Sequence, residues 1–290
     1  MKFEDIKVST KTIIAVTNLT IDINLLFDYL ETTPYKIIKK KRGRKKKKDN
    51  INLNMDVAEG SIITLKYQDD IKGVETKNKK KNLSRKKYFR NALSVIMVLK
   101  DNNLNKLINF KISKNGKFQI TGCKKLEHAE KIIKYTWNII KDNKNIYNLE
   151  DKHFKTVFNT VMTNIDFNVG YLINRENLNK YINQHTEYNS LLETSFGYTG
   201  VNIKIPVKRD LSTLDLPCLK NINNEWITTQ VNAGPYLNKN KKKRYNTFLV
   251  FHSGNVIMSG MIKEIMKPDY IFFNKILKDS KDIIKERLDI

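Results

Sequence analysis

Few residues of this 290-residue chain have the types and spacing that covalent or metal chemistry needs. The histidines and cysteines are scattered, without neighbours at ligand spacing: they are His128, His153, His185, His252, Cys123 and Cys218. The sequence contains no glycine-rich phosphate loop and no metal-spaced cluster of carboxylates. We therefore expect no enzymatic activity, no metal and no cofactor. Glu127 and His128 fall in a charge-rich helical pattern and are expected on its surface.

The chemistry that the sequence does offer is cationic. Lys and Arg number 54 against 30 Asp and Glu, so the net charge is +24, which favours a polyanionic partner. The densest run, Lys39–Lys48, predicts a solvated loop: either a flexible insertion, or a phosphate-binding arm or nuclear-localisation-like signal. No apolar run approaches the roughly 18 residues of a membrane span, and no signal peptide opens the chain. We expect an intracellular protein without a membrane role.

A pattern that occurs twice predicts the elements that position these charges. Asn109–Gly122 and Thr247–Gly260 each contain two alternating runs joined by a glycine turn, and each ends in a hydroxyl residue followed by glycine. Alternation across a tight glycine turn is typical of a β-hairpin. Each hairpin is followed by a helical pattern, Lys125–Lys141 and Ile262–Leu288. We interpret the two units as a tandem repeat, with two unrelated hairpins as the simpler alternative.

Each half of the chain has the same predicted order of elements: strand, helix, further strands, hairpin and long helix. The halves are residues 1–148 and 149–290, and polar or basic insertions interrupt them near 36–50, 69–90 and 210–245. Two such halves can pair their strands into one antiparallel sheet whose helices cover one face and leave the other open.

Two single residues carry further predictions. Thr20 is expected to be the N-cap of a helix over residues 21–31. Trp226 lies in the insertion near 210–245, and loops of that length usually have structure of their own. We expect Trp226 to anchor packing rather than to stack on a ligand.

Strand parity separates the two faces of each hairpin. An all-apolar set must pack against helices: Phe110, Ile112, Phe118 and Ile120 in the first hairpin, Phe248, Val250, Val256 and Met258 in the second. The opposite face is cationic in the first hairpin and more apolar in the second. An open face on a chain of this charge predicts a nucleic-acid surface. Phe251, on that face, is either a binding wedge or an ordinary exposed side chain.

The hairpin Leu249–Gly260 reads apolar-apolar-Phe-x-Ser-Gly-x-apolar-x-apolar-hydroxyl-Gly and resembles the hairpin of the TATA-box-binding protein family. Asn115–Lys124, Ile173–Leu178 and Tyr198–Lys204 resemble the divergent versions encoded by large cytoplasmic DNA viruses. The resemblance covers most of the chain outside the insertions, and its specificity comes from the duplicated order of motifs. It implies an α+β fold: a pseudo-twofold saddle of two tandem repeats, with one curved antiparallel sheet and helices on its convex face.

The resemblance also implies a function. Family members lay the concave sheet face on the minor groove of promoter DNA, wedge aromatic side chains into base steps and recruit the initiation machinery. Phe251 and Tyr198 match the wedge positions of the second repeat, whereas Ser113 and a position near Ala92 replace the wedges of the first. Because each wedge unstacks a base step to gain contact surface, we expect weaker kinking at the first repeat.

The other DNA-contacting positions fall on the open faces. Asn159, Thr12, Thr121 and Ser259 match the central hydrogen-bonding positions of the family, and Lys204 matches a phosphate-binding arginine. The remaining residues of the expected DNA-binding face are Leu249, Ile257, Gln119, Lys117 and Lys111.

The expected partners are double-stranded, AT-rich promoter DNA and initiation factors or RNA polymerase. The protein is then expected to be a monomer at the viral replication site in the host cytoplasm or in the virion, or otherwise in the nucleus. One alternative is a module of the same fold that binds proteins through its insertions and DNA only non-specifically. Another is a glycosylase, since some carry a related saddle domain, but we expect no room for its helical catalytic domain.

Overall fold

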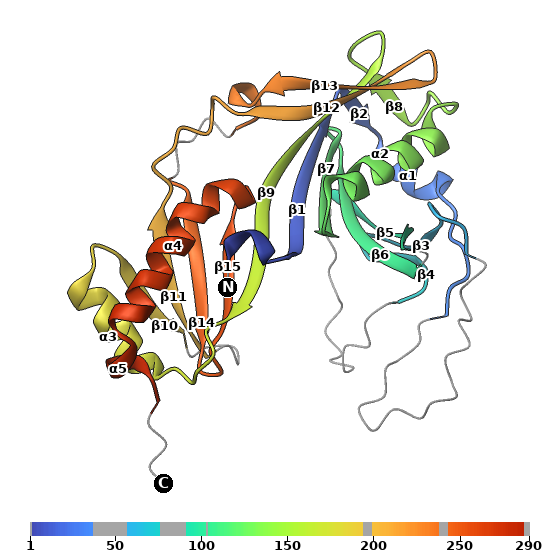
Figure 1. The fold of residues 1–290 in the computed structure, drawn as a ribbon. Helices are drawn as coiled ribbons and strands as arrows, with labels where there is room; N and C mark the ends of the chain where they lie inside the picture. Colours follow the sequence, from blue (N-terminus) through green and yellow to red (C-terminus); the bar gives the residue numbers. More distant parts are fainter. Residues whose placement is uncertain are drawn as a thin grey trace. The chain divides into compact units, whose positions relative to one another are not determined.

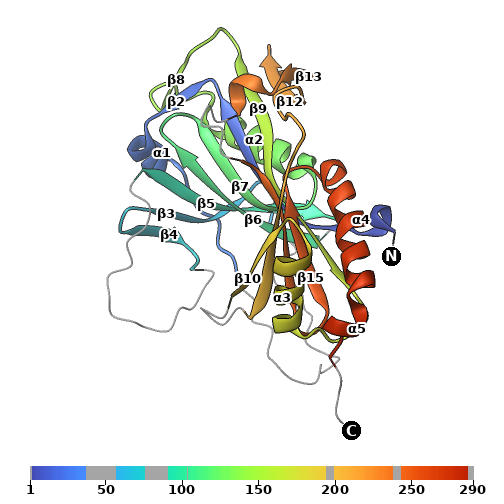
Figure 2. The ribbon, with the colours of Figure 1, turned by 90° about the vertical axis from the view of Figure 1, so that its left-hand side faces the viewer.

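The computed structural model describes residues 2–36, 57–75, 91–102, 104–193, 199–237 and 243–286. They form two compact units (Figures 1 and 2). The N-terminal unit consists of Ile13–Asn159 and Asp215–Val231; the C-terminal unit consists of Thr160–Leu214, Asn232–Ile290 and the chain start as far as Thr12. In each unit, helices pack on one face of an antiparallel sheet, so the expected α+β class is confirmed. The predicted division at residue 148 concerns the sequence repeats and stays a prediction.

The sheet of the N-terminal unit has the strand order β1-β7-β6-β5-β3-β4. These strands are β1 (Val8–Thr17, which begins in the C-terminal unit), β3 (Ile62–Tyr67), β4 (Asp70–Gly73), β5 (Ala92–Asp101), β6 (Leu104–Ser113) and β7 (Lys117–Cys123). A small second sheet pairs β2 (Leu19–Ile21) with β8 (Tyr147–Leu149). The unit also contains helices α1 (Ile23–Tyr29) and α2 (Leu126–Ile140). The first predicted hairpin is therefore confirmed as β6 and β7, and the helix after it as α2.

The apolar face of the β6–β7 hairpin packs against α1 and α2, as its parity predicts. Phe110 and Phe118 stack with their ring centroids 6.2 Å apart and are at most 2% exposed. The apolar positions of α2 recur at helical spacing, from Ala129 through Ile133 to Trp137, and all lie in the same core. Burial of each such large side chain contributes roughly 1.5–3 kcal/mol, so this face fixes the orientation of the hairpin.

The sheet of the C-terminal unit has the strand order β10-β11-β14-β15-β9. These strands are β9 (Phe154–Asn168, which begins in the N-terminal unit), β10 (Asn189–Glu193), β11 (Gly200–Pro206), β14 (Tyr245–Phe251) and β15 (Asn255–Gly260). The helices are α3 (Arg175–His185), α4 (Lys263–Asp279) and α5 (Lys281–Ile284), with short 3-10 turns at Phe3–Asp5 and Gly234–Tyr236. The second predicted hairpin is confirmed as β14 and β15, whereas the long helix predicted after it is divided at Ser280 into α4 and α5.

The core of the C-terminal unit lies between this sheet and its helices. Phe248 of β14 stacks on Phe273 of α4 with ring centroids 4.3 Å apart. Phe248, Val250, Val256 and Met258 are all fully buried, as parity predicts. The opposite face of the hairpin is consequently free of helices from its own unit (Figures 1 and 2).

The same local contacts occur in both units. Gly116, at φ +65°, and Gly254, at φ +77°, close the two hairpin turns, and a Cβ on either glycine would collide with a backbone carbonyl oxygen, that of Leu19 or Tyr171. In the N-terminal unit Ile21 N donates to Lys114 O at 2.8 Å, and in the C-terminal unit Ile173 N donates to His252 O at 2.9 Å. These matching contacts support the tandem-repeat interpretation over two unrelated hairpins.

The predicted N-cap at Thr20 is wrong. Thr20 lies inside strand β2, where its partner is Asn148, so its backbone is committed to the small sheet. Asp22 caps α1 instead, and its Oδ1 accepts hydrogen bonds from the backbone N–H groups of Asn24 (2.9 Å) and Leu25 (3.1 Å).

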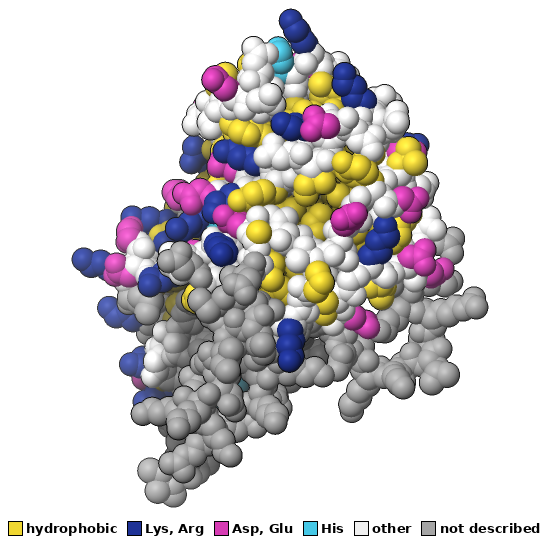
Figure 3. Space-filling model, turned by 90° about the vertical axis from the view of Figure 1, so that its right-hand side faces the viewer, with side chains coloured by type: hydrophobic (Ala, Val, Ile, Leu, Met, Phe, Trp, Pro, Cys, Tyr) yellow, Lys and Arg dark blue, Asp and Glu magenta, His cyan; other side chains and the backbone are white. Residues whose placement is uncertain are grey.

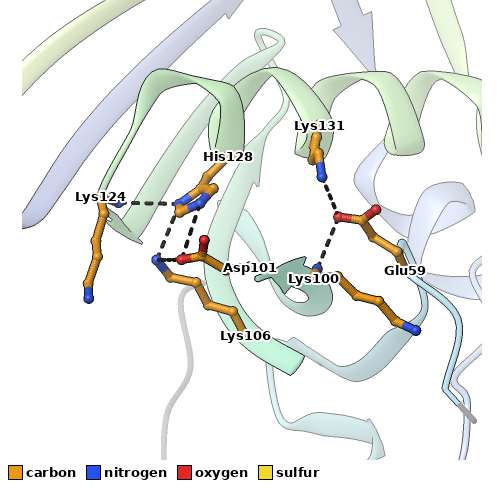
Figure 4. A network of polar contacts seen from close by, with 7 residues as sticks. All are labelled: Glu59, Lys100, Asp101, Lys106, Lys124, His128 and Lys131. Atoms are coloured by element: carbon orange, nitrogen blue, oxygen red, sulfur yellow. Dashed lines mark hydrogen bonds and ion pairs between the residues drawn. The ribbon is translucent and has the colours of Figure 1, made fainter. Parts of the chain in front are cut away.

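The predicted surface position of His128 is also wrong, because its side chain turns toward the end of the β5–β6 hairpin (Figure 4). The residue is 4% exposed. Its Nδ1 accepts from the backbone N–H of Lys124 and from Lys106 Nζ, both at 3.3 Å, and its Nε2 lies 3.8 Å from Asp101 Oδ2. Burial first, and then the charge of Lys106, lower the pKa of His128. The folded environment of His128 therefore favours the neutral form of its imidazole.

The insertion near 210–245 contains a hairpin of β12 (Asp215–Ile222) and β13 (Glu225–Asn232). Residues 218–221 of β12 pair with β9. Trp226 of β13 contacts the ring of Phe154 edge-on, with centroids 5.9 Å apart, so its predicted packing role is confirmed. The Lys39–Lys48 run, and most of the insertion near 69–90, lie outside the described residues.

Candidate nucleic-acid interface

The open face of the C-terminal unit carries an ordered row of side chains across five strands. Registers between neighbouring strands place Leu191, Asn202, Leu249, Ile257 and Asp166 side by side, in that order. Leu249 and Ile257 are half-buried, and Leu191 is 63% exposed. We call this set the apolar row, because three of its five side chains are aliphatic. It ends on the carboxylate of Asp166.

A second row lies one step along the strands. It contains Asn189, Lys204, Thr247, Ser259 and Asn164. Lys204 is exposed, whereas Ser259 is half-buried beside Asn164. The Oδ1 atom of Asn164 is buried and has no hydrogen-bond partner among the described residues. This row offers hydroxyl and amide groups next to a cation, which suits the edges of bases and the phosphates beside them.

Phe251 lies two residues beyond Leu249 on the same face, where β14 enters its glycine turn. Its backbone position pairs with Gly200, and its carbonyl oxygen accepts from Gly254 N at 3.0 Å. The side chain is partly exposed. A side chain at Gly200 would require the Leu249 side chain to move, because a Cβ there would lie 2.8 Å from Leu249 Cδ1. Tyr198, the other predicted wedge, lies outside the described residues.

The open face of the N-terminal unit is polar. One row contains Ile71, Lys66, Ser94, Lys111 and Gln119. Lys111 is half-buried, and burial lowers its pKa, whereas Gln119 is exposed. The next row brings Asn109 beside Thr121, whose hydroxyl donates to Asn109 O at 3.0 Å. Lys117 is exposed at the start of β7. The predicted residues Lys111, Lys117, Gln119 and Thr121 thus share one face.

The wedge positions of the N-terminal unit contain no aromatic side chain. Ala92 and Ser113 are directly opposite each other on β5 and β6. Ser113 Oγ donates to Asn115 Oδ1 at 2.6 Å, so this hydroxyl group forms a hydrogen bond within the β6–β7 turn. This pair of small side chains contrasts with Phe251 beside Gly200 in the C-terminal unit.

Two predicted hydrogen-bonding residues are hardly accessible. Thr12 of β1 is 8% exposed and Asn159 of β9 is 6% exposed. The open faces are thus formed mainly by the hairpins and their neighbouring strands. The roles assigned to Thr12 and Asn159 by the family resemblance stay predictions.

Sequence reasoning missed several residues of these faces, namely Asp166, Asn164, Asn202, Thr247 and Leu191. The face on which each of these side chains lies follows from strand parity once its pairing partner is known. Asp166, for example, shares the face of its partner Ile257. The signal in the sequence was the alternation of residues 161–168, which extends the parity argument to β9. Asp166 is exposed. It places a negative charge on a face expected to contact a polyanion.

Figure 3 views the molecule from the side where α1 and α2 lie in Figure 1, and hydrophobic side chains gather there among charged ones. On α1, Leu25 is 45% exposed and Tyr29 is 43% exposed. Tyr29, Ile62 and Ile139 line a cavity of about 370 Å³. Within the described residues, no helix is long and apolar enough to cross a membrane, and no three His, Cys, Asp or Glu side chains could together hold a metal ion.

No protein-family model matches the chain. It is 28% identical to the uncharacterized protein 335L of Invertebrate iridescent virus 6 over 238 residues, which cover 73% of this chain and 67% of that protein. It is 27% identical to a TATA-box-binding protein-like protein of Acanthamoeba polyphaga mimivirus over 219 residues, covering 69% of this chain and only 54% of the mimivirus protein. Among solved structures, the TBP of Methanococcus jannaschii matches 96% of this chain and 99% of its own, with 14% identity and a TM-score of 0.46. The similarity to the mimivirus protein confirms the predicted resemblance to divergent viral TATA-box-binding protein-like proteins.

Proposed function

We propose that the chain is a TATA-box-binding-protein-like initiation factor, which binds double-stranded promoter DNA in the minor groove and recruits transcription machinery. The observation that carries the proposal is the open face of β14 and β15. There, half-buried Leu249 and Ile257 lie opposite each other, with Phe251 toward the glycine turn and Ser259 toward the other end of the hairpin. In this proposal the two repeats form the saddle of the family, with both open faces on its concave side.

In the proposed complex, cationic and apolar groups contribute to DNA binding in different ways. Lys204, Lys111 and Lys117 supply attraction to phosphates, which is strong at low salt and independent of sequence. The apolar row fits the floor of a widened minor groove, which displays few polar groups at A·T pairs. Insertion of Phe251 would cost a few kcal/mol of base stacking, which contact with the bent duplex offsets.

The bend is expected to be unequal. Only the C-terminal unit carries an aromatic side chain at a described wedge position, whereas Ser113 and Ala92 face each other in the N-terminal unit. We therefore propose one strong kink, at the end of the site bound by Phe251, rather than two equal ones.

Recruitment would use surfaces away from the open faces. The exposed apolar side chains of α1, Leu25 and Tyr29, support such a contact with initiation factors or RNA polymerase. The proposal includes no catalytic step. We propose that the protein acts as a monomer. Its site of action would be the place where the viral genome is transcribed, in the host cytoplasm or the virion, or otherwise the nucleus.

A second candidate function is a protein-interaction module of the same fold that binds DNA only non-specifically. Asp166 favours it, because an exposed carboxylate beside Ile257 repels phosphates. The burial of Thr12 and Asn159 favours it as well, since neither can easily reach a base edge.

Fluorescence anisotropy with an AT-rich and a GC-rich duplex of equal length, across a salt series, tests the proposal. The wild-type chain should prefer the AT-rich duplex at least tenfold, about 1.4 kcal/mol, and Phe251→Ala should remove the preference. Phe272→Ala is the matched control, because Phe272 is 37% exposed on α4, outside the open face. Equal binding of both duplexes with a steep salt slope, unchanged by Phe251→Ala, would refute minor-groove recognition and leave the second candidate.

A further inference from the structure

The hairpin of β12 and β13 ends in an open strand edge. β12 pairs with β9 on one side and β13 on the other, whereas β13 pairs only with β12 (Figure 1). Among the described residues, no backbone group outside the hairpin bonds to residues 226–231. The strand is eight residues long, compared with a usual strand length of about 5–6 residues. Its unpaired N–H and C=O groups are a template for another strand.

The two end strands of the larger strand order, β10 and β4, are protected. At the edge strand β10, Asn183 of α3 imitates a neighbouring strand: its Oδ1 accepts from Ser190 N at 2.9 Å and its Nδ2 donates to Ser190 O at 3.2 Å. The edge strand β4 has only four residues, including Asp70 and Lys72, and Lys72 Nζ is bound to Phe27 O at 2.7 Å. Short length, charge and covering side chains are the usual protections of an edge.

β13 has fewer of these protections, since its one charged residue, Glu225, lies at the end next to the turn. Its sequence, EWITTQVN, contains no Lys, Arg, Pro or Gly, although Lys and Arg make up 54 of the 290 residues of the chain. Thr, Ile and Val favour the extended conformation that strand pairing needs. Ile227 is 42% exposed. An edge of this composition would promote aggregation unless a partner covers it.

The geometry of the turn shows which groups face outward. Asn223 and Asn224 have φ of 50° and 67°, as in a two-residue type I′ turn. The residues that flank such a turn form the first hydrogen-bonded pair, so alternate residues beyond it point their N–H and C=O groups away from β12. The outward groups therefore belong to Trp226, Thr228 and Gln230.

The charges around the edge favour an acidic partner. Lys220 and Lys155 are directly opposite each other on β12 and β9, and within the described part of the chain neither forms an ion pair. Like charges in that position are destabilising, so an anion in their neighbourhood is favourable. Lys134 Nζ lies 5.7 Å from the ring centre of Trp226, and Lys141 Nζ donates to Asn224 Oδ1 at 3.2 Å.

A second copy of the chain fits this edge poorly. Two molecules of charge +24 would repel, and the lysines beside β13 would approach those of the other copy within the screening distance of about 8 Å. We propose that β13 binds an extended acidic segment of a partner protein, which adds to the sheet as an antiparallel or parallel strand. Main-chain hydrogen bonds from Trp226, Thr228 and Gln230 give the affinity, and acidic side chains beside the lysines select the partner. This interaction does not depend on DNA binding.

The test uses the full chain and a fluorescein-labelled, end-capped peptide that alternates Glu with Val or Ile over eight residues. A copy of the peptide with N-methyl groups on alternate amides keeps the charge but cannot pair as a strand. The unmodified peptide should bind at least tenfold more tightly than the N-methylated one. Equal binding of the two peptides would overturn the proposal and leave only charge attraction to a basic protein.

Variants at Thr228 place the binding on β13. Thr228→Pro removes one outward N–H, a change that an edge strand tolerates, and should weaken peptide binding at least tenfold. Thr228→Val keeps the N–H and the strand propensity, so its affinity should stay within twofold of wild type. Unchanged affinity in Thr228→Pro would overturn the proposal. So would sedimentation of wild type as a dimer that Thr228→Pro converts to a monomer, because a second copy would then occupy the edge.

Discussion

Gly254 and Gly170 offer a matched pair of substitutions that tests how the β14–β15 turn holds Phe251. Both glycines lie in the C-terminal unit and have positive φ, 77° and 87°. A Cβ on Gly170 would meet nothing within 4 Å, whereas a Cβ on Gly254 would collide with the backbone oxygen of Tyr171 and touch Val169. Gly170→Ala therefore introduces only the backbone penalty, and Gly254→Ala adds the collision.

The magnitudes follow from these two terms. An alanine held at positive φ costs roughly 1–2 kcal/mol, which is the full expected loss for Gly170→Ala. Overpacking against a neighbour that cannot move adds roughly 1–3 kcal/mol, and a backbone carbonyl is such a neighbour. We expect Gly254→Ala to lower the unfolding free energy of the C-terminal unit by about 2–5 kcal/mol.

Urea unfolding followed by far-UV circular dichroism, with hydrogen exchange of peptides covering β14 and β15, measures this difference. Tryptophan fluorescence is an internal control, because both tryptophans, Trp137 and Trp226, lie in the N-terminal unit. The fluorescence midpoint should change little in either variant. Equal losses in Gly254→Ala and Gly170→Ala would refute the close contact between the hairpin turn and the chain after β9.

Three further predictions concern single side chains. Because the pKa of His128 is lowered in the fold, stability should fall as pH drops below the ordinary value near 6.5, by up to about 1.4 kcal/mol per pH unit, and urea unfolding of His128→Gln should show a flatter dependence. Asp166→Asn should tighten duplex binding about twofold at low salt, since a charge pair near 8 Å in water is worth about 0.5 kcal/mol, and anisotropy at high salt should show no gain. Gly200→Ala should displace the Leu249 side chain and weaken the preference for AT-rich DNA in the same assay, with little change in the urea midpoint, because the collision is with a flexible side chain.

The local elements of the fold were predictable because each rests on short-range periodicity. The two hairpins and the helices after them follow from alternation, a glycine turn and helical spacing within one continuous stretch of sequence each. The buried faces of β6, β7, β14 and β15 followed from parity alone. Thr20 failed as a cap because β2 pairs with β8, a contact across more than 120 residues that no local pattern contains.

The candidate site was predictable only in part. Phe251, Leu249, Ile257 and Ser259 share one face because they lie on one hairpin, so parity was sufficient. Asp166 and Asn202 join them only through the pairing of β9 and β11 with that hairpin. The burial of Thr12 and Asn159 is likewise a property of their neighbours and not of their own segments.

The sequence by itself determined the repeated hairpin-helix unit, the cationic character and the likeness to viral TATA-box-binding protein-like proteins, because these depend on composition and on neighbours along the chain. Only the tertiary structure decided that His128 is buried beside Lys106, that Asp166 lies in the apolar row and that β13 is left with an open edge. Each of these depends on which distant segments pair, and pairing is set by the sum of many contacts across the sheet. No single stretch of residues determines that sum.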